Sequence, residues 1–276
     1  MQTKSKVYLV VVHTLLIIGS SVMIWPFIWM IITSFKTVTE ATAMNPFKFF
    51  PSQLRLENYK GVIEQFNFLR LYFNTFSMIA INVLCAIVFS SMAAFAFARL
   101  EFPGRDFCFG IVLFQMMIPT QIFIIPQYLM VDKLGARNTI FALVFPGLVS
   151  AFGTFLLRQF FKMIPKELEY SARIDGCNIG QMFVRIMFPL VKPGLVALSI
   201  FTALFAFKNL MWPLIINPSP DAATLASALS KIQGAYSVNY PRLMAASVLA
   251  VCPMLILYFI FQKQFMQSVV TSGLTM

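Results

Sequence analysis

Charged side chains are scarce in this sequence, and acidic ones are the scarcest. Asp and Glu number ten among 276 residues, and charged residues make up 11% of the chain, against about 25% in ordinary soluble domains. All ten acidic residues lie between long apolar segments or at their edges. An ion-coupled carrier usually needs an ionisable group inside the bilayer, most often a carboxylate. The lack of one counts against that class of transporter.

Histidine, cysteine and nucleotide-binding motifs are also rare or missing. His13 is the only histidine, and the four cysteines are dispersed without the spacing of a metal site: Cys85, Cys108, Cys177 and Cys252. No GxxxxGK[ST] sequence occurs, so we expect no ATP bound by a P-loop. No GxSxG sequence provides an activated serine. The sequence therefore predicts a protein that is not an enzyme and that holds no cofactor or metal of its own.

Hydrophobic residues make up 59% of the chain, and the mean hydropathy is +0.80. A helix of roughly 20 apolar residues crosses the hydrocarbon core of a bilayer. Six segments qualify, at about 7–32, 72–98, 107–130, 139–161, 190–216 and 243–262. The sequence therefore predicts an all-α polytopic membrane protein with about six transmembrane helices, in one domain over residues 1–276 that contacts membrane lipid.

The basic residues bear on partners and orientation. In a soluble protein a net charge of +11 would suggest nucleic acid, but in a membrane protein basic loops set orientation and meet anionic headgroups. We therefore expect no nucleic-acid partner. Lys and Arg divide almost evenly between the two sides that six spans would create, so charge alone does not determine the topology.

One polar stretch, residues 164–193, lies between the fourth and fifth predicted spans and reads as two short helices. Pro165 suits a first helical position, Gly176 suits a left-handed helix end, and Asn178 suits the cap of a second helix. We expect Pro189 to end that second helix. Its apolar residues fall on one face at helical spacing: Ile179, Met182, Phe183, Ile186 and Met187. On pattern alone, an interfacial helix pair resting on lipid is the alternative.

The spacing within this stretch resembles the EAA loop of ABC importer permeases, whose pattern is Glu-Ala-Ala, three residues, Gly, nine residues and Ile-x-Leu-Pro. Here the corresponding positions are Tyr170, Ser171, Ala172, Gly176, Ile186, Phe188 and Pro189, and Asp175 also matches. Tyr170, Ser171 and Phe188 depart from the pattern. We hypothesise that Glu169 takes over the acidic role. Residues 164–193 are called the EAA-like loop below.

Other phrases extend the resemblance to the carbohydrate-import branch of these permeases, of the maltose-system MalG type. They are Asn58-Tyr59, the run Phe97 to Arg105, and Trp212-Pro213-Leu214. The resemblance implies a multi-pass subunit of the cell membrane, with both termini and the EAA-like loop in the cytoplasm.

The resemblance also implies partners. They are a homologous second permease in a heterodimer, two ABC ATPases that bind ATP and Mg, and an extracellular or periplasmic solute-binding protein. The cargo would be a carbohydrate, and we expect an oligosaccharide. The loop would dock in an ATPase groove, with the apolar face of Ile179, Met182, Phe183 and Ile186 toward protein and the small residues Ser171, Ala172 and Gly176 at the contact.

Lys208 is the one basic residue deep in an apolar segment, followed by Asn209 and Trp212. An unpaired charge in hydrocarbon is costly, so these three residues could line the substrate path, where Lys208 would favour an anionic cargo. Lys208 could equally extend to the interface near the end of a span. Two other functions remain open: an ABC permease for a non-sugar solute, and an ion-coupled secondary carrier.

Overall fold

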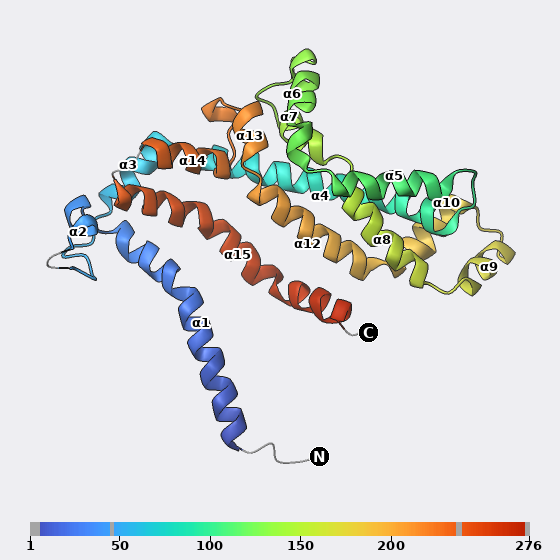
Figure 1. The fold of residues 1–276 in the computed structure, drawn as a ribbon, viewed down its shortest axis with the longest axis horizontal. Coiled ribbons are helices and arrows are strands. Elements are labelled where there is room, and N and C mark those ends of the chain that lie inside the picture. Colours follow the sequence, from blue (N-terminus) through green and yellow to red (C-terminus); the bar gives the residue numbers. More distant parts are fainter. Residues whose placement is uncertain (1–5, 45–46, 236–238, 274–276) are drawn as a thin grey trace. The chain divides into compact units, whose positions relative to one another are not determined.

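The structure, a computed structural model, describes residues 6–44, 47–235 and 239–273. Within these ranges the regular elements are all helices, and no strand occurs (Figure 1). The chain divides into two compact units, one of residues 1–67 and 229–256 and the other of residues 68–228 and 257–276. The all-α prediction is confirmed for the described residues.

The first unit contains the N-terminal helix and a long connection. Its helices are α1 (Lys6–Ser34), α2 (Val38–Thr42), α3 (Glu57–Gln65) and the first part of α15 (Tyr240–Gly273). Apolar residues surround α1 on every side, and none of its most apolar stretch is buried within this chain. A helix that is apolar all round is stable only when lipid or another protein covers it.

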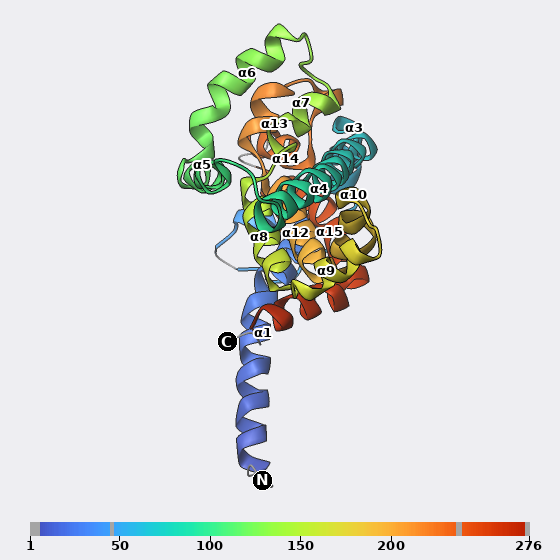
Figure 2. The same ribbon diagram turned by 90° about the vertical axis from the view of Figure 1, so that its right-hand side faces the viewer.

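The second unit is built around α4 (Phe68–Arg99), with α8 (Ala151–Met163) and α12 (Lys192–Lys208) packed along it (Figures 1 and 2). Buried small residues on α4, including Ala86, Ser90 and Ala94, allow this close approach. Gly153 of α8 shows how close it is, because a Cβ there would lie 2.6 Å from the Ser90 hydroxyl.

The remaining helices of this unit are short or bent. They are α5 (Arg105–Met117), η1 (Thr120–Phe123), α6 (Ile124–Lys133), α7 (Ile140–Val144), η2 (Phe145–Gly147), α9 (Glu167–Ile174), α10 (Ile179–Met182), the π-helical turn η3 (Phe183–Met187), α11 (Phe188–Leu190), α13 (Met211–Ile216), η4 (Pro220–Ala222) and α14 (Leu225–Ala235), which runs into the first unit.

Two helices of the described chain, α1 and α4, are each long and apolar enough to cross a membrane alone. Three further spans would each be a pair of helices, bent by 97° between α5 and α6, by 50° before α8, and by 75° before α12. A shorter apolar helix covers Tyr240–Ile256. Pro119 lies at the first break, and Pro189 and Pro193 lie on either side of the third; carbonyls freed by prolines need partners from neighbouring helices. The number of six spans stays a prediction.

Candidate functional site: the EAA-like loop

The first helix of the EAA-like loop is α9. It begins at Glu167, so the prediction that Pro165 is its first residue is wrong, and it ends before Gly176, whose φ is +78°. The Gly176 amide donates to the Arg173 carbonyl at 3.1 Å, and the Cys177 amide donates to the Ala172 carbonyl at 2.9 Å. These bonds satisfy carbonyls at the helix end, and the left-handed glycine predicted from sequence is confirmed.

Asn178 caps the second helix, as predicted. Its side-chain oxygen accepts from the Gln181 amide at 2.8 Å, and the Gln181 side chain accepts from the Asn178 amide at 3.0 Å. This reciprocal pair is a capping box, which satisfies two amides that the helix itself leaves without partners.

Pro189 lies one residue before the end of the second helix, not at the end as predicted. Pro189 lies inside α11, and the helical segment runs on to Leu190 before the chain bends. The preceding turn is π-helical: the Phe188 amide donates to the Phe183 carbonyl, five residues back. Proline has no amide to donate and its ring crowds the carbonyl four residues before it, so a wider turn accommodates Pro189 without ending the helix.

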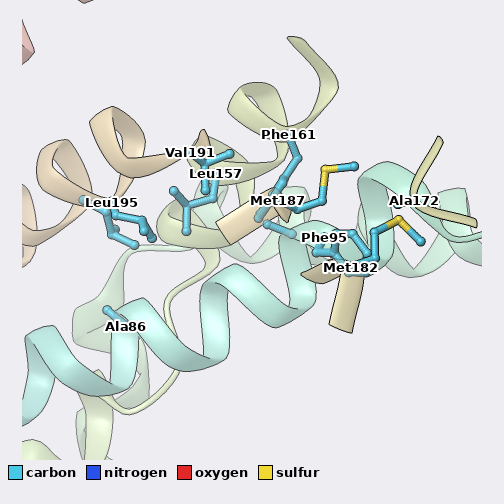
Figure 3. Packing of buried hydrophobic residues seen from close by; sticks show 11 residues of the cluster. Ala86, Phe95, Leu157, Phe161, Ala172, Met182, Met187, Val191 and Leu195 are labelled. Carbon is cyan, nitrogen blue, oxygen red and sulfur yellow. The ribbon is translucent and has the colours of Figure 1, made fainter. Parts of the chain in front are cut away.

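The apolar face of the second helix packs into the chain's own core. Met182 and Met187 are fully buried in the cluster that contains Phe95 of α4 (Figure 3). The ring centroids of Phe183 and Phe95 are 5.1 Å apart. Ile186 packs against the same cluster. Of the face expected to lie toward protein, Met182 is therefore covered by the chain itself, whereas Phe183 and Ile186 are only partly buried.

A different set of side chains is exposed on the loop. Tyr170 is 59% exposed, Ile174 86% and Ile179 53%. Ser171, Asp175 and Gly176 are exposed beside them, whereas Ala172 is buried. Exposed apolar residues that gather on a polar loop are typical of a surface that a partner covers.

Glu169 lies on the inner side of α9. Its Oε1 is 2.7 Å from a terminal guanidinium nitrogen of Arg99, and the two side chains are only 12% and 5% exposed. Within this chain it is therefore an internal ion-pair partner. Glu169, which we hypothesised to take over the acidic role of the pattern, therefore points into its own chain, and Tyr170 is the exposed neighbour.

The three residues predicted for the substrate path lie in different environments. Lys208 is the last residue of α12 and is exposed, and Asn209 is the partly buried cap after it. A basic residue at the C-terminus of a helix is stabilised by the helix dipole. Trp212 is buried, and its indole N–H donates to the Ala142 carbonyl at 2.8 Å. The placement of Trp212 on a path is therefore wrong, because it is part of the core.

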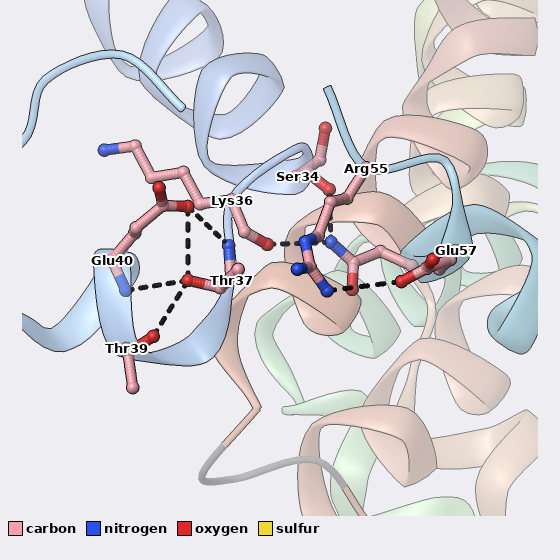
Figure 4. Close-up of polar contacts among 8 residues, drawn as sticks. Ser34, Lys36, Thr37, Thr39, Glu40, Arg55 and Glu57 are labelled. Carbon is pink, nitrogen blue, oxygen red and sulfur yellow. Dashed lines mark hydrogen bonds and ion pairs between the residues drawn. The ribbon is translucent and has the colours of Figure 1, made fainter. Parts of the chain in front are cut away.

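A second set of polar residues, in the connection after α1, was not predicted to have a role. Lys36 is buried, donates to the Lys48 carbonyl at 2.8 Å, and has its ammonium 4.5 Å from the centre of the Trp29 ring. Burial lowers the pKa of Lys36, an effect that the nearby Glu40 carboxylate partly opposes. Figure 4 shows this region of the connection, including Lys36, Thr37 and Glu40.

The Asn58-Tyr59 phrase explains part of this arrangement. The Asn58 side chain donates to the Ser34 and Lys36 carbonyls at 2.8 and 3.0 Å, and the Tyr59 hydroxyl lies 2.6 Å from that of Ser34. These bonds attach α3 to the end of α1. The dipeptide was the sequence signal for this attachment, although its partners lie too far along the chain to be deduced from spacing.

No group of three His, Cys, Asp or Glu residues in the described parts of the chain is arranged to hold a metal ion.

Comparison with known proteins relates the chain to membrane components of transport systems. Residues 86–271 match the family described as binding-protein-dependent transport system inner membrane component. An arabinooligosaccharide transport system permease protein of Halalkalibacterium halodurans is 34% identical over 91% of this chain and 90% of its own length. An sn-glycerol-3-phosphate transport system permease protein of Shigella flexneri is 29% identical over 94% and 95%.

Among solved structures, a chain of a bacterial ABC transporter involved in the import of the acidic polysaccharide alginate has the same fold. The TM-score is 0.79 at 23% identity, over 95% of this chain and 99% of the other. At that identity the likeness concerns the fold alone.

Proposed function

Because the chain belongs to the family of binding-protein-dependent transport inner membrane components, we propose that it is one permease subunit of an ATP-driven importer for an oligosaccharide. The observation that carries the proposal is the 34% identity, over nearly the whole chain, to an arabinooligosaccharide permease. Members of the family are membrane permeases of ABC transporters and not enzymes, so the prediction that this chain is not an enzyme is confirmed. The relatives named for oligosaccharide and lactose transport also confirm the resemblance to sugar permeases.

The proposed assembly contains this chain, a homologous second permease, two ATPases that bind ATP and Mg, and an external solute-binding protein. The chain would cross the cell membrane six times with both termini in the cytoplasm. Support comes from the family, which takes its name from a binding protein and the inner membrane. None of the most apolar stretch of α1 is buried, which is consistent with coverage by lipid or a second permease.

We propose that the ATPase docks on the exposed side of the EAA-like loop, chiefly on Tyr170, Ile174 and Ile179. These three large side chains are more than half exposed on a loop outside the long apolar helices. Apolar surface of this kind is favourable to bury against a partner. The opposite side of the loop is packed on the chain's own core.

This two-sided arrangement suits the transmission of movement. ATP binding would draw the two ATPases together and push the loops that they hold. Because Met182 and Met187 are buried against α4 and α8, a pushed loop would carry those helices with it. The importer would then alternate between two global states, one of which ATP favours.

An anionic solute is a second candidate for the substrate class. Lys208 is exposed at the end of α12, and one relative is named for sn-glycerol-3-phosphate, an anionic solute. If Lys208 lines the path, an anionic cargo such as a phosphate ester would be stabilised there. An ion-coupled carrier is disfavoured by the family and by the lack of acidic residues in the apolar segments.

The first test is purification of the chain from its native membrane in a mild detergent, with mass spectrometry of the proteins that accompany it. We expect a P-loop ATPase and a second permease. Recovery of the chain alone, under conditions that keep other complexes intact, would contradict the proposal. Transport that persists after ATP depletion but stops with the ion gradient would favour the carrier instead.

The docking surface is tested by Ile174→Asp and Ile179→Asp. Each places a carboxylate in an apolar contact, so we expect loss of the ATPase from the purified complex with normal amounts of the chain in the membrane. Leu134→Asp is the matched control, since Leu134 is 66% exposed but lies on the connection between α6 and α7. Equal loss of the ATPase in the control, or retention in both test variants, would refute this docking surface.

A further inference from the structure

Arg99 occupies a junction of three helices in the second unit. It is the last residue of α4, and its guanidinium lies 2.7 Å from the Glu169 carboxylate of α9. The same guanidinium donates to the carbonyls of Phe161 and Ile164, at the end of α8. Carbonyls at the last turn of a helix have no partner within the helix, so an arginine fork is well suited to satisfy them.

A second arginine connects two of these helices, this time from α8 to α4. Arg158 of α8 donates from Nε to the Phe97 carbonyl of α4 at 3.2 Å, and its guanidinium lies 3.9 Å from the centre of the Phe109 ring. The ends of α4 and α8 are therefore cross-connected by two arginines. Only Arg99 extends the connection to the EAA-like loop.

We infer that the ion pair of Arg99 and Glu169 holds α9 against α4 and α8, so that the three helices move together. Arg99 and Glu169 are then positioning residues for coupled transport. This inference rests on the function proposed above. Both charges are shielded from water, and separating them would leave two unpaired charges in a poorly solvated place. The ion pair therefore stays intact when the loop is displaced, and the displacement is transmitted to α4.

The alternative role for Glu169, contact with an ATPase, is disfavoured by its position. Its side chain points to Arg99, on the same side of α9 as the buried Ala172, whereas Tyr170 and Ile174 are exposed. A residue that acts by holding the loop should affect how well ATP hydrolysis is coupled to transport. A residue of the docking surface should affect whether the ATPase binds at all.

The test uses the complete importer, with its ATPases, second permease and binding protein, in liposomes of phosphatidylethanolamine and phosphatidylglycerol. ATP hydrolysis and uptake of labelled arabinotriose are measured in the same vesicles. Glu169→Gln keeps the shape but removes the charge. We expect the ratio of solute taken up to ATP hydrolysed to fall roughly five-fold or more, the range of a typical coupling free energy, while the ATPase stays bound.

Glu167→Gln is the matched control, because Glu167 is on the same helix and exposed. We expect its ratio to equal that of the unaltered chain. Glu169→Asp keeps the charge with a shorter reach and should lose less than Glu169→Gln. A ratio that is unchanged in Glu169→Gln, or lowered equally in Glu167→Gln, would overturn the inference.

Two other outcomes separate a failure of the proposed function from a failure of this inference. If the unaltered chain brings no ATPase or takes up no arabinotriose, the proposed function or its substrate fails, and not this inference alone. If Glu169→Gln and Arg99→Lys both prevent assembly while Glu167→Gln assembles normally, the pair serves folding only and its role in coupling is refuted.

Discussion

The backbone at Gly176 has a φ of +78°, which residues with a Cβ adopt at a cost and which proline cannot reach. Its amide also donates to the Arg173 carbonyl. We therefore expect Gly176→Pro to abolish transport, because the turn between α9 and α10 loses both its conformation and a hydrogen bond. Uptake and the amount of the chain in the membrane, measured by immunoblot, check this result.

The matched control is Gly180→Ala, four residues further along the loop. Gly180 lies inside α10, and a Cβ there would meet only the Asn178 side chain, at an ordinary 3.5 Å. Alanine also favours helix. Transport should therefore be retained in this variant, and normal transport by Gly176→Pro would show that the shape of the turn is unimportant.

At the scale of elements, α2 is the clearest case of a helix held by side chains, since five residues are too few to be stable alone. Hydrogen bonds from Ser52 and then Thr37 lower the pKa of Glu40 from 4.5 to about 2. A lowered pKa means that the ionised carboxylate stabilises the folded connection above pH 4.5, and that this contribution is lost as the pH falls toward about 2.

We therefore expect the amides of α2 to lose protection from hydrogen exchange between pH 4.5 and about 2, after correction for the intrinsic exchange rate. Glu40→Gln has no charge to lose, so its α2 should be less protected at neutral pH and nearly insensitive to pH over this interval. Protection in the unaltered chain that does not change over the same interval would contradict the role of the carboxylate.

At the scale of the whole molecule, the proposed topology puts the EAA-like loop and both termini in the cytoplasm. Basic residues do not determine this orientation, because they divide almost evenly between the two sides. We expect a fluorescent protein fused after Met276 to fluoresce, and alkaline phosphatase fused after Gly135 to be active outside the cytoplasm. The reciprocal fusions should be inactive, and the reversed pattern at both positions would invert the topology.

Local features of the loop were predictable because their causes are local. The left-handed Gly176 and the Asn178 cap each depend on a few neighbouring residues. The outcome at Pro189 was not predictable in the same way. A proline usually interrupts a helix, but here a π-helical turn precedes it, and the packing of Met187 in the core stabilises that turn.

Which face of each short helix is buried could be determined only from the tertiary structure. An apolar stripe on a short helix is the same whether it is covered by its own chain or by a partner, so periodicity could not separate Met182, which is buried, from Ile179, which is exposed. Trp212 was placed on a path because it follows Lys208 in an apolar segment, and the hydrogen bond from its indole N–H to the Ala142 carbonyl of a distant helix shows that it belongs to the core.

The sequence by itself determined the membrane class, the helical fold and the helix–turn–helix form of the loop, because composition and short-range spacing suffice for these. Tertiary structure alone decided which loop residues are exposed, where the predicted spans bend, and that Glu169 pairs with Arg99. Those features depend on contacts between residues far apart in the chain, and a buried ion pair forms only where folding has already brought both charges together.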